Sequence, residues 1–236
     1  MTAARPPLPP ATRTVLVTGA SGGLGPAVVE AFLAGGWRVV AASRSGRAER
    51  RDGLLTVAAD LGDEAGVAAA VEAAAADPAA PLRALVNLVG GYVAGTRLHE
   101  TPVATLEAQL ALNLRPTLLA TRAALPHLIA AGGGAIVCLS ARAALAPFSG
   151  AAAYATSKAA VLALVQAVAV EYRRDGVRCN AVVPSVIDTP ANRAAQPDAD
   201  HSRWVPPEQV AAVVRFLCGD ESLPTSGATV PVYGRA

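Results

Sequence analysis

The sequence carries little charge for its length. Of its 236 residues, 16% are charged, and the formal net charge is only +2. Basic residues cluster only between Arg44 and Arg51, so we expect no nucleic-acid partner. The sequence also lacks an unbroken apolar run of about 18 residues, the length that a membrane-spanning helix needs. We therefore expect no membrane partner.

Cysteines and clusters of metal ligands are scarce as well. The three cysteines, at positions 138, 179 and 218, are too few and too scattered for a disulfide framework, and the three histidines stand apart. We expect buried free thiols, a reducing cytoplasmic location and no metal site. Residues 1–12 contain four prolines but no apolar core, so we expect a disordered lead and no signal peptide.

Short apolar runs alternate with longer alanine-rich segments along the rest of the chain. This alternation predicts an α/β fold with one doubly wound, parallel Rossmann-type sheet and helices on both faces, formed by residues 13–236 as a single domain. Strands are predicted at 14–18, 37–42, 54–59, 82–89, 136–139, 177–183 and 228–232, and helices after residue 25 and at 63–76, 102–131, 154–175 and 207–218.

Two segments interrupt this regular pattern. The predicted helix 102–131 contains Pro116 and Pro126, and each proline should kink or break it. Residues 188–206 have no apolar period, so we expect a loop there with at most one short helical turn. Loops at the carboxyl ends of parallel strands commonly carry substrate sites.

A glycine-rich turn joins the first strand to the first helix, and residues 19–25 read Gly-Ala-Ser-Gly-Gly-Leu-Gly. Glycines allow the backbone to approach a pyrophosphate, and the helix N-terminus offers free N–H groups. This context favours a dinucleotide site over an ordinary tight turn. The second strand ends at Ser43 and Arg44, and an arginine at that place suits the 2′-phosphate of NADP, although a merely solvated Arg44 is the alternative.

Tyr154 and Lys158 lie four residues apart and therefore share one face of a predicted helix. We expect the nearby ammonium to lower the pKa of the phenol, which would let Tyr154 exchange a proton with a carbonyl or alcohol oxygen. Ser140, at the end of a buried strand, can hydrogen-bond the same oxygen. The alternative is an ordinary surface pair. Asn113 is a polar residue in an apolar helix and could equally be a satisfied core amide.

These motifs, in this order, resemble those of the short-chain dehydrogenase/reductase family over residues 13–234. The resemblance implies that Tyr154 is the acid/base, that Ser140 orients the substrate carbonyl and that Lys158 assists Tyr154 and holds the nicotinamide ribose. Asn113 would fix a water that relays protons to Lys158. One departure is Ser185, where the family usually has glycine. The implied cofactor-binding residues are Gly19, Ser21, Gly22, Gly23, Leu24, Gly25, Ser43, Arg44, Asp60, Leu61, Asn87, Gly90, Tyr154, Lys158, Pro184, Ile187 and Thr189.

The resulting hypothesis is an oxidoreductase that uses NADP, with NAD possible, and moves hydride between nicotinamide and a carbonyl or alcohol (EC 1.1.1.-). Tyr92, Phe148 and Trp204 could wall a pocket for a cyclic or aromatic substrate, although Trp204 could instead pack its loop onto the body. The loop 188–204 and Gly90-Gly91-Tyr92 are similar to those of quinonoid dihydropteridine reductases, which leaves a ring reductase as one alternative. A non-catalytic NADP-binding sensor is another.

Two helices suggest self-association. The helix after Lys158 is apolar nearly all round, which is more than one sheet face can cover, and the segment 102–131 is also apolar. The family resemblance places both at a subunit interface. We therefore expect a homo-oligomer, a tetramer or a dimer.

Overall fold

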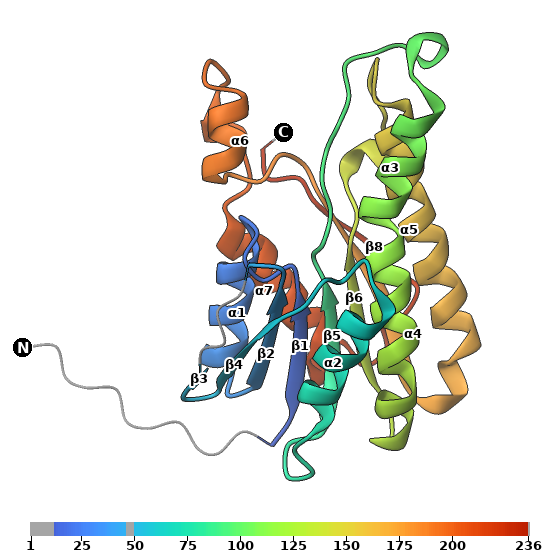
Figure 1. Cartoon of the computed structure of the whole chain (residues 1–236). Helices are drawn as coiled ribbons and strands as arrows, with labels where there is room; N and C mark the ends of the chain where they lie inside the picture. The colour runs from blue at the N-terminus through green and yellow to red at the C-terminus, as the bar shows by residue number, and fades with distance from the viewer. Residues whose placement is uncertain (1–11, 46–49, 236) are drawn as a thin grey trace, which may run out of the picture.

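The computed structural model describes residues 12–45 and 50–235, and the predicted lead therefore lies almost wholly outside the described residues. The described chain forms one sheet in the order β3-β4-β2-β1-β5-β6-β7-β8 (Figure 1). All neighbouring strands are parallel except the two-residue β3, which the sequence analysis missed. The strands are β1 (Thr14–Thr18), β2 (Arg38–Ser43), β3 (Arg50–Arg51), β4 (Leu54–Ala58), β5 (Leu82–Asn87), β6 (Gly134–Leu139), β7 (Val177–Pro184) and β8 (Thr229–Val232).

Helices cover both faces of the sheet, as the alternating pattern predicted (Figure 1). Within β1, Val15 and Val17 pack with helices α1 and α7, whereas Leu16 packs with α2, α4 and α5 on the other face. Successive strand residues point to opposite faces, so both faces must be apolar when helices cover each of them. The helices are α1 (Gly25–Ala34), α2 (Glu64–Ala75), α3 (Val103–Asn113), α4 (Arg115–Ala130), α5 (Ala152–Glu171), α6 (Pro190–Ala195) and α7 (Pro207–Cys218).

The strand order creates a switch point between β1 and β5. The chain adds strands outward from β1 on one side and then returns to build the other side from β5. Helices that follow β1 and β5 therefore diverge, which opens a crevice at the carboxyl ends of these strands. The glycine turn after β1 and the Gly90-Gly91 segment after β5 both lie at this edge.

The segment predicted as one helix over 102–131 is two helices, α3 and α4. The break falls at Leu114, and Pro116 lies in the first turn of α4, where its missing N–H does least harm. Pro126, by contrast, lies inside α4, which continues to Ala130. The helix is therefore interrupted next to Pro116, as expected, and is not broken at Pro126.

Helix α5 corrects the expectation about apolar length. It is 20 residues long with a mean hydropathy of 1.5, so by length and composition alone it could cross a membrane. The search for an unbroken run missed it, because residues such as Gln166 interrupt the run without making the helix polar. Its inner face packs against β7 and carries the buried Lys158. That is the placement of a core helix, which passes the same test of composition.

The three cysteines are free and buried, as expected. Cys138 lies in β6 and Cys179 in the adjacent strand β7, and both belong to the same side of the core. Cys218 ends α7 in the core on the opposite face.

Candidate active site

The glycine turn presents its backbone at the carboxyl edge of the sheet. Ser21, Gly22 and Gly23 are exposed just before the N-terminus of α1, whereas Leu24 is buried in the core. Gly19 has a positive φ of 70°, and a methyl group there would lie 2.9 Å from the backbone nitrogen of Val89. The turn therefore needs glycine to pass this close to the end of β5. An exposed peptide turn at a helix N-terminus suits a pyrophosphate.

The end of β2 carries a cation at the place predicted for a ribose contact. Ser43 is buried at the strand end, and the following Arg44 is exposed and forms no ion pair with another described residue. Beside it, the Ser45 hydroxyl lies 3.3 Å from that of Ser21. This hydroxyl pair connects the end of β2 to the glycine turn. The sequence analysis named Ser21 but not Ser45, whose signal is only its position after Arg44.

Three further predicted cofactor-binding residues lie at the ends of β4 and β5. Asp60 is exposed, and its carboxylate accepts a hydrogen bond from the backbone N–H of Gly62 at 2.9 Å. Leu61 is buried in the core, so its backbone is the part that faces the edge. Asn87 is also buried and donates to the Thr121 hydroxyl at 3.2 Å. Its side chain therefore holds the end of β5 in place.

Asn113 and Lys158 meet at the Gly90 backbone. A methyl group on Gly90 would lie 2.7 Å from Asn113 Oδ1 and 2.9 Å from Lys158 Nζ. Asn113 Oδ1 accepts the backbone N–H of Gly91 at 2.9 Å, and Lys158 Nζ donates to the carbonyl of Leu139 at 3.1 Å. Because both side chains are almost completely buried, glycine is the residue that fits at position 90.

Two buried polar residues that the sequence analysis missed hold Asn113. Its Nδ2 donates to Gln109 Oε1 at 3.2 Å and to Ser157 Oγ at 3.0 Å. Ser157 Oγ in turn donates to the Tyr154 carbonyl at 2.8 Å. The signal for Gln109 was present in the sequence, since it stands one helical turn before Asn113 in an apolar helix. Asn113 is thus a fully bonded core amide, whichever further role it has.

Ser140 and Tyr154 occupy the same edge of the sheet but are not hydrogen-bonded to one another in this ligand-free structure. Ser140 is buried, and its hydroxyl donates to the backbone carbonyl of Lys158 at 2.9 Å. Tyr154 is half-buried in the first turn of α5, one turn before Lys158. The fold therefore brings Ser140, Tyr154, Lys158 and Asn113 together, and a rotation of the Ser140 hydroxyl would be needed for it to reach a substrate.

The expected lowering of the Tyr154 pKa was wrong. Burial, together with the neighbouring Tyr92, raises the pKa of Tyr154 to about 12. Burial also lowers the pKa of Lys158 to about 8, against a weaker opposing effect of Cys138. Desolvation disfavours the charged form of both groups. The sequence showed the Tyr–Lys spacing but could not show how completely these side chains are buried.

Of the three predicted pocket walls, Tyr92 contacts the acid/base, Phe148 contacts Tyr92, and Trp204 packs within its own loop. The Tyr92 ring meets the Tyr154 ring edge-on with centroids 5.0 Å apart, and Phe148 lies 6.4 Å from Tyr92. Both Tyr92 and Phe148 are more than half exposed. Trp204 is 9% exposed and packs on His201 at 4.3 Å. The alternative that Trp204 anchors its loop to the body is therefore the one that its burial favours.

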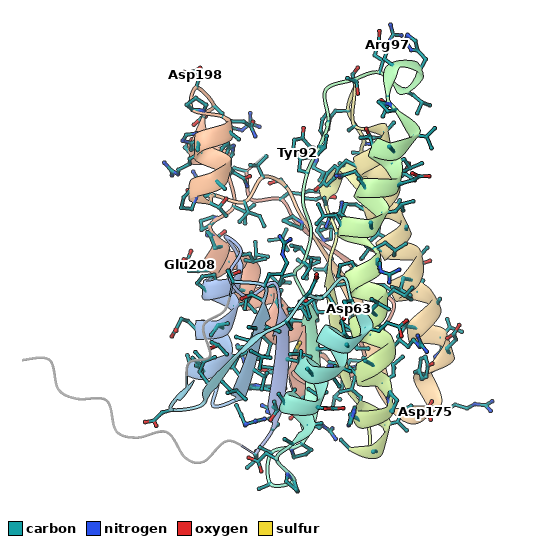
Figure 2. All side chains as sticks on the ribbon, viewed as in Figure 1. Asp63, Tyr92, Arg97, Asp175, Asp198 and Glu208 are labelled. Carbon is teal, nitrogen blue, oxygen red and sulfur yellow. The ribbon has the colours of Figure 1, made fainter. Side chains whose placement is uncertain are left out.

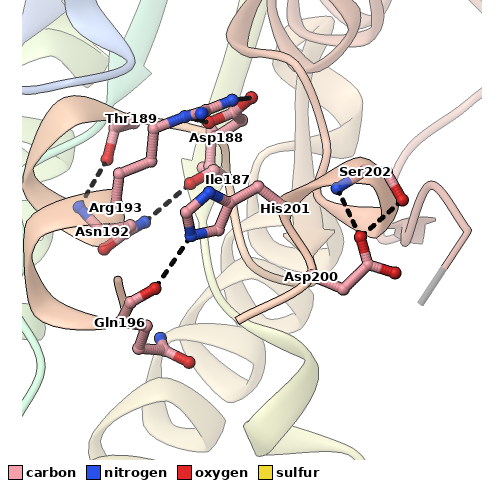
Figure 3. A network of polar contacts seen from close by, with 9 residues as sticks. All are labelled: Ile187, Asp188, Thr189, Asn192, Arg193, Gln196, Asp200, His201 and Ser202. Carbon is pink, nitrogen blue, oxygen red and sulfur yellow. Dashed lines mark hydrogen bonds and ion pairs between the residues drawn. The ribbon is translucent and has the colours of Figure 1, made fainter. Parts of the chain in front are cut away.

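The segment after β7 is more ordered than the predicted loop (Figure 3). It contains α6 and a turn of 3-10 helix at His201–Arg203, and Ile187 pairs with Val205 at its base. Thr189 caps α6 by accepting the N–H of Asn192, and Arg193 forms a two-pronged ion pair with Asp188. The Thr189 side chain also rests on Gly23 of the glycine turn. Pro184 ends β7 and is buried, so this segment covers the turn from a fixed base.

Two projections rise above the carboxyl edge of the sheet. Figure 2 shows Asp198 at the tip of one and Arg97 at the tip of the other, with Tyr92 between them in this view. The first projection is the segment around α6, and the second joins residues 92–101 to residues 145–151 through the Gly95 N–H, which donates to the Gly150 carbonyl at 3.0 Å. Tyr92 and Phe148 both belong to the second projection, and Tyr92 connects it to the Tyr154 ring.

Comparison with known proteins supplies the context for this geometry. The family profile described as short chain dehydrogenase matches residues 13–200. The 2-(R)-hydroxypropyl-CoM dehydrogenase of Xanthobacter autotrophicus is 38% identical, covering 94% of this chain and 98% of that protein. The cis-4-hydroxycyclohexanecarboxylate dehydrogenase of Sinomonas cyclohexanicum is 33% identical over 95% and 96% of the two chains. A crystal structure of an oxidoreductase of the short chain dehydrogenase/reductase family from Burkholderia thailandensis has a TM-score of 0.82, 31% identity and coverage of 95% and 92%.

Proposed function

The chain belongs to the short-chain dehydrogenase family, and we propose that it is an NADP-dependent oxidoreductase that interconverts a secondary alcohol and a ketone. The observation that carries this proposal is the convergence of Tyr154, Lys158, Ser140 and Asn113 beside the glycine turn, at the switch point of the sheet. In open α/β sheets this is where ligands bind.

The exposed edge fits a dinucleotide. Ser21–Gly23 offers peptide groups for the pyrophosphate, and Asp60 is exposed at the neighbouring strand end. Arg44, with the Ser21 and Ser45 hydroxyls next to it, supports a 2′-phosphate and hence NADP over NAD. No acidic residue stands beside Arg44 at the end of β2, where NAD-dependent proteins place a carboxylate for the ribose 2′-OH. NAD would bind without the phosphate contact and therefore more weakly.

Tyr154 transfers the proton, and Ser140 and Lys158 assist it. When bound, the nicotinamide supplies or accepts the hydride. Because the pKa of Tyr154 is about 12 in the ligand-free structure, Tyr154 keeps its proton at neutral pH and can donate it to a carbonyl oxygen. Ser140 then orients that oxygen, and the cationic form of Lys158 favours the tyrosinate that remains. In the oxidation direction Tyr154 takes the hydroxyl proton of the alcohol.

The substrate class draws on the relatives and on the aromatic residues. The names of both relatives specify secondary alcohols, one a hydroxypropyl group and the other a hydroxycyclohexane ring. The second of these names also specifies a carboxylate on the ring, away from the hydroxyl. Tyr92 and Phe148 offer flat apolar surfaces beside Tyr154. We therefore favour a cyclic ketone or alcohol over a short aliphatic one.

Self-association belongs to the same proposal. Helices α3, α4 and α5 leave large apolar side chains on the surface at Leu112, Leu118 and Val170, the last of them 66% exposed. A second copy that packs on these helices would cover them, which supports a dimer or tetramer. The three free, buried cysteines support a reducing compartment such as the cytoplasm.

The test combines a substrate panel with one substitution. Purified protein is mixed with NADPH and cyclic ketones, aliphatic ketones, quinones and quinonoid dihydropterins, and nicotinamide absorbance is followed. Cyclic ketones should react fastest, and Tyr154→Phe should lower their turnover by about 10²–10⁴-fold while cofactor binding survives. A Phe variant that keeps more than about a tenth of the rate would contradict the assignment. Fast dihydropterin turnover would favour the ring-reductase alternative, and cofactor binding without any turnover would favour the sensor.

A further inference from the structure

Three adjacent strand ends bring Arg142, Ser185 and Tyr233 together. Strands β6, β7 and β8 are neighbours in the sheet, and these residues follow their carboxyl ends. The Arg142 guanidinium lies 5.0 Å from the centre of the Tyr233 ring. Ser185 Oγ donates to the Tyr233 carbonyl at 2.8 Å. The C-terminal segment is thereby fixed between the segment after β7 and the loop after β6.

The free donors of Arg142 distinguish it from Arg193 and Arg203, the two arginines of the segment after β7. Arg142 is exposed, and among the residues that the structure describes none accepts a hydrogen bond from its side chain or forms an ion pair with it. Arg193 is instead neutralised by Asp188, and Arg203 donates to the Arg235 carbonyl. A guanidinium uses its flat face on an aromatic ring and keeps its N–H groups at the edge. Arg142 is therefore held in place with its hydrogen-bond donors available.

The position of Arg142 relates it to the reacting atoms. It stands two residues after Ser140, so the two Cα atoms lie within about 7 Å of each other. The short 3-10 helix that begins at Arg142 (Arg142–Ala144) packs against α5, which carries Tyr154 and Lys158. The Arg142 side chain therefore starts beside the residues that would hold the substrate carbonyl, at the end of the strand that carries Ser140.

We propose that Arg142 is a specificity-determining residue that binds a carboxylate or sulfonate carried by the substrate away from the reacting carbon. This inference rests on the proposed function and names the substrate class for that site. An edge-on guanidinium matches the geometry of such an anion with two parallel hydrogen bonds. Among the described residues no acid is paired with Arg142, so the anion displaces no internal partner.

Ser185 and Tyr233 act as positioning residues in this arrangement. The family usually has glycine where this chain has Ser185, and a glycine there could not donate to the Tyr233 carbonyl. The hydroxyl therefore fixes the backbone of Tyr233, and the Tyr233 ring contacts the Arg142 guanidinium. Ser185, which replaces the usual glycine of the family, thus contributes to substrate selection.

The experiment compares two ketones of the same shape. The kcat/KM values of 4-oxocyclohexanecarboxylate and of its uncharged amide are measured with NADPH. Wild type should prefer the carboxylate, and Arg142→Gln should lower the ratio of the two kcat/KM values about tenfold, since a hydrogen bond to a charged group is typically worth that much. Ser185→Gly and Tyr233→Leu should lower the ratio by smaller factors. The control Arg173→Gln, on an exposed arginine beyond the opposite end of α5, should leave the ratio unchanged.

A binding measurement separates this inference from the proposed function. Cyclohexanecarboxylate and cyclohexanecarboxamide, which cannot react as ketones, are titrated by calorimetry into the Tyr154→Phe protein saturated with NADPH, with and without Arg142→Gln. Tighter carboxylate binding that is lost in the double variant supports the role of Arg142 even if no ketone is turned over. Equal binding of the two compounds, a preference that survives Arg142→Gln, or no carboxylate binding up to about 10 mM would each overturn it.

Discussion

Replacing Lys158 with methionine should stabilise the ligand-free protein at pH 7 and abolish its activity. Lys158 is 4% exposed, and among the described residues its ammonium donates a hydrogen bond only to the Leu139 carbonyl. Burial of this cation lowers its pKa from 10.5 to about 8. At pH 7 both the folded and the unfolded chain carry the charge, so the folded state bears the desolvation cost.

The size of this cost follows from the two pKa values. Each pKa unit corresponds to about 1.4 kcal/mol, so a fall from 10.5 to about 8 amounts to roughly 3 kcal/mol at pH 7. Methionine fills a similar volume without a charge but leaves the Leu139 carbonyl without its partner, which costs about 1–2 kcal/mol. The expected net gain is therefore about 1–2 kcal/mol, or roughly 2–8 °C in Tm for a chain of this size.

The dependence on pH gives the sharper test. Between pH 8 and 10.5 the unfolded chain binds more protons at this position than the folded chain, so the wild type gains stability relative to the variant as pH rises. At about 1.4 kcal/mol per pH unit above the folded pKa of about 8, the net advantage of methionine should disappear near about pH 9, and the wild type should be the more stable protein by about pH 10.5. Denaturant unfolding of both proteins at several pH values measures this difference. A methionine variant that is less stable at pH 7, or a difference that does not change with pH, would refute the reasoning.

The sequence offers a direct check, since Lys158 is its only lysine. Protein labelled with ¹³C at the lysine Cε atom gives a single lysine signal, which needs no assignment. That signal should titrate with a pKa of about 8. A signal that titrates near 10.5 would show that the ammonium is solvated and that no such cost exists.

Two further predictions concern the cofactor and the assembly. Arg44→Ala should weaken NADP binding about tenfold or more while NAD binding changes little, because only NADP has the phosphate; titration of both cofactors checks this, and unchanged NADP affinity counts against it. Light scattering should give a multiple of 23.7 kDa, and Val170→Glu should shift the particle toward that mass; a wild type that is already a single 23.7 kDa particle would exclude the proposed interface.

Much of the fold could be predicted because strands that are buried on both faces of the sheet consist almost entirely of apolar residues, and such runs are visible in the sequence. The strand around Val15 and Val17 is apolar at every position, as a strand between two helix layers must be. The glycine turn could also be predicted, since Gly19 and Gly25 lie where a methyl group would collide with the backbone. Strand β3 could not be predicted in this way, because two residues are too few to show a period.

The site was less predictable because its properties depend on contacts between distant segments. The spacing of Tyr154 and Lys158 was visible, but the placement of Tyr92 against Tyr154 was not, and together with burial it reverses the expected direction of the Tyr154 pKa. Trp204 shows the same limit. An aromatic residue in a polar loop can wall a pocket or anchor the loop, and only its burial against His201 distinguishes the two.

The break between α3 and α4 joins the fold to the chemistry. Pro116 has no N–H to donate to the carbonyl of Leu112, so a continuous helix would lose a hydrogen bond there and gain a clash. The chain instead ends α3 at Asn113, and the Thr117 hydroxyl donates to the freed Asn113 carbonyl at 3.2 Å. The Asn113 side chain can then bridge Gly91 and Ser157, which belong to segments on either side of it. Pro116 interrupts the helix, and this interruption places the Asn113 amide between the Gly90-Gly91 segment after β5 and helix α5, which carries the acid/base.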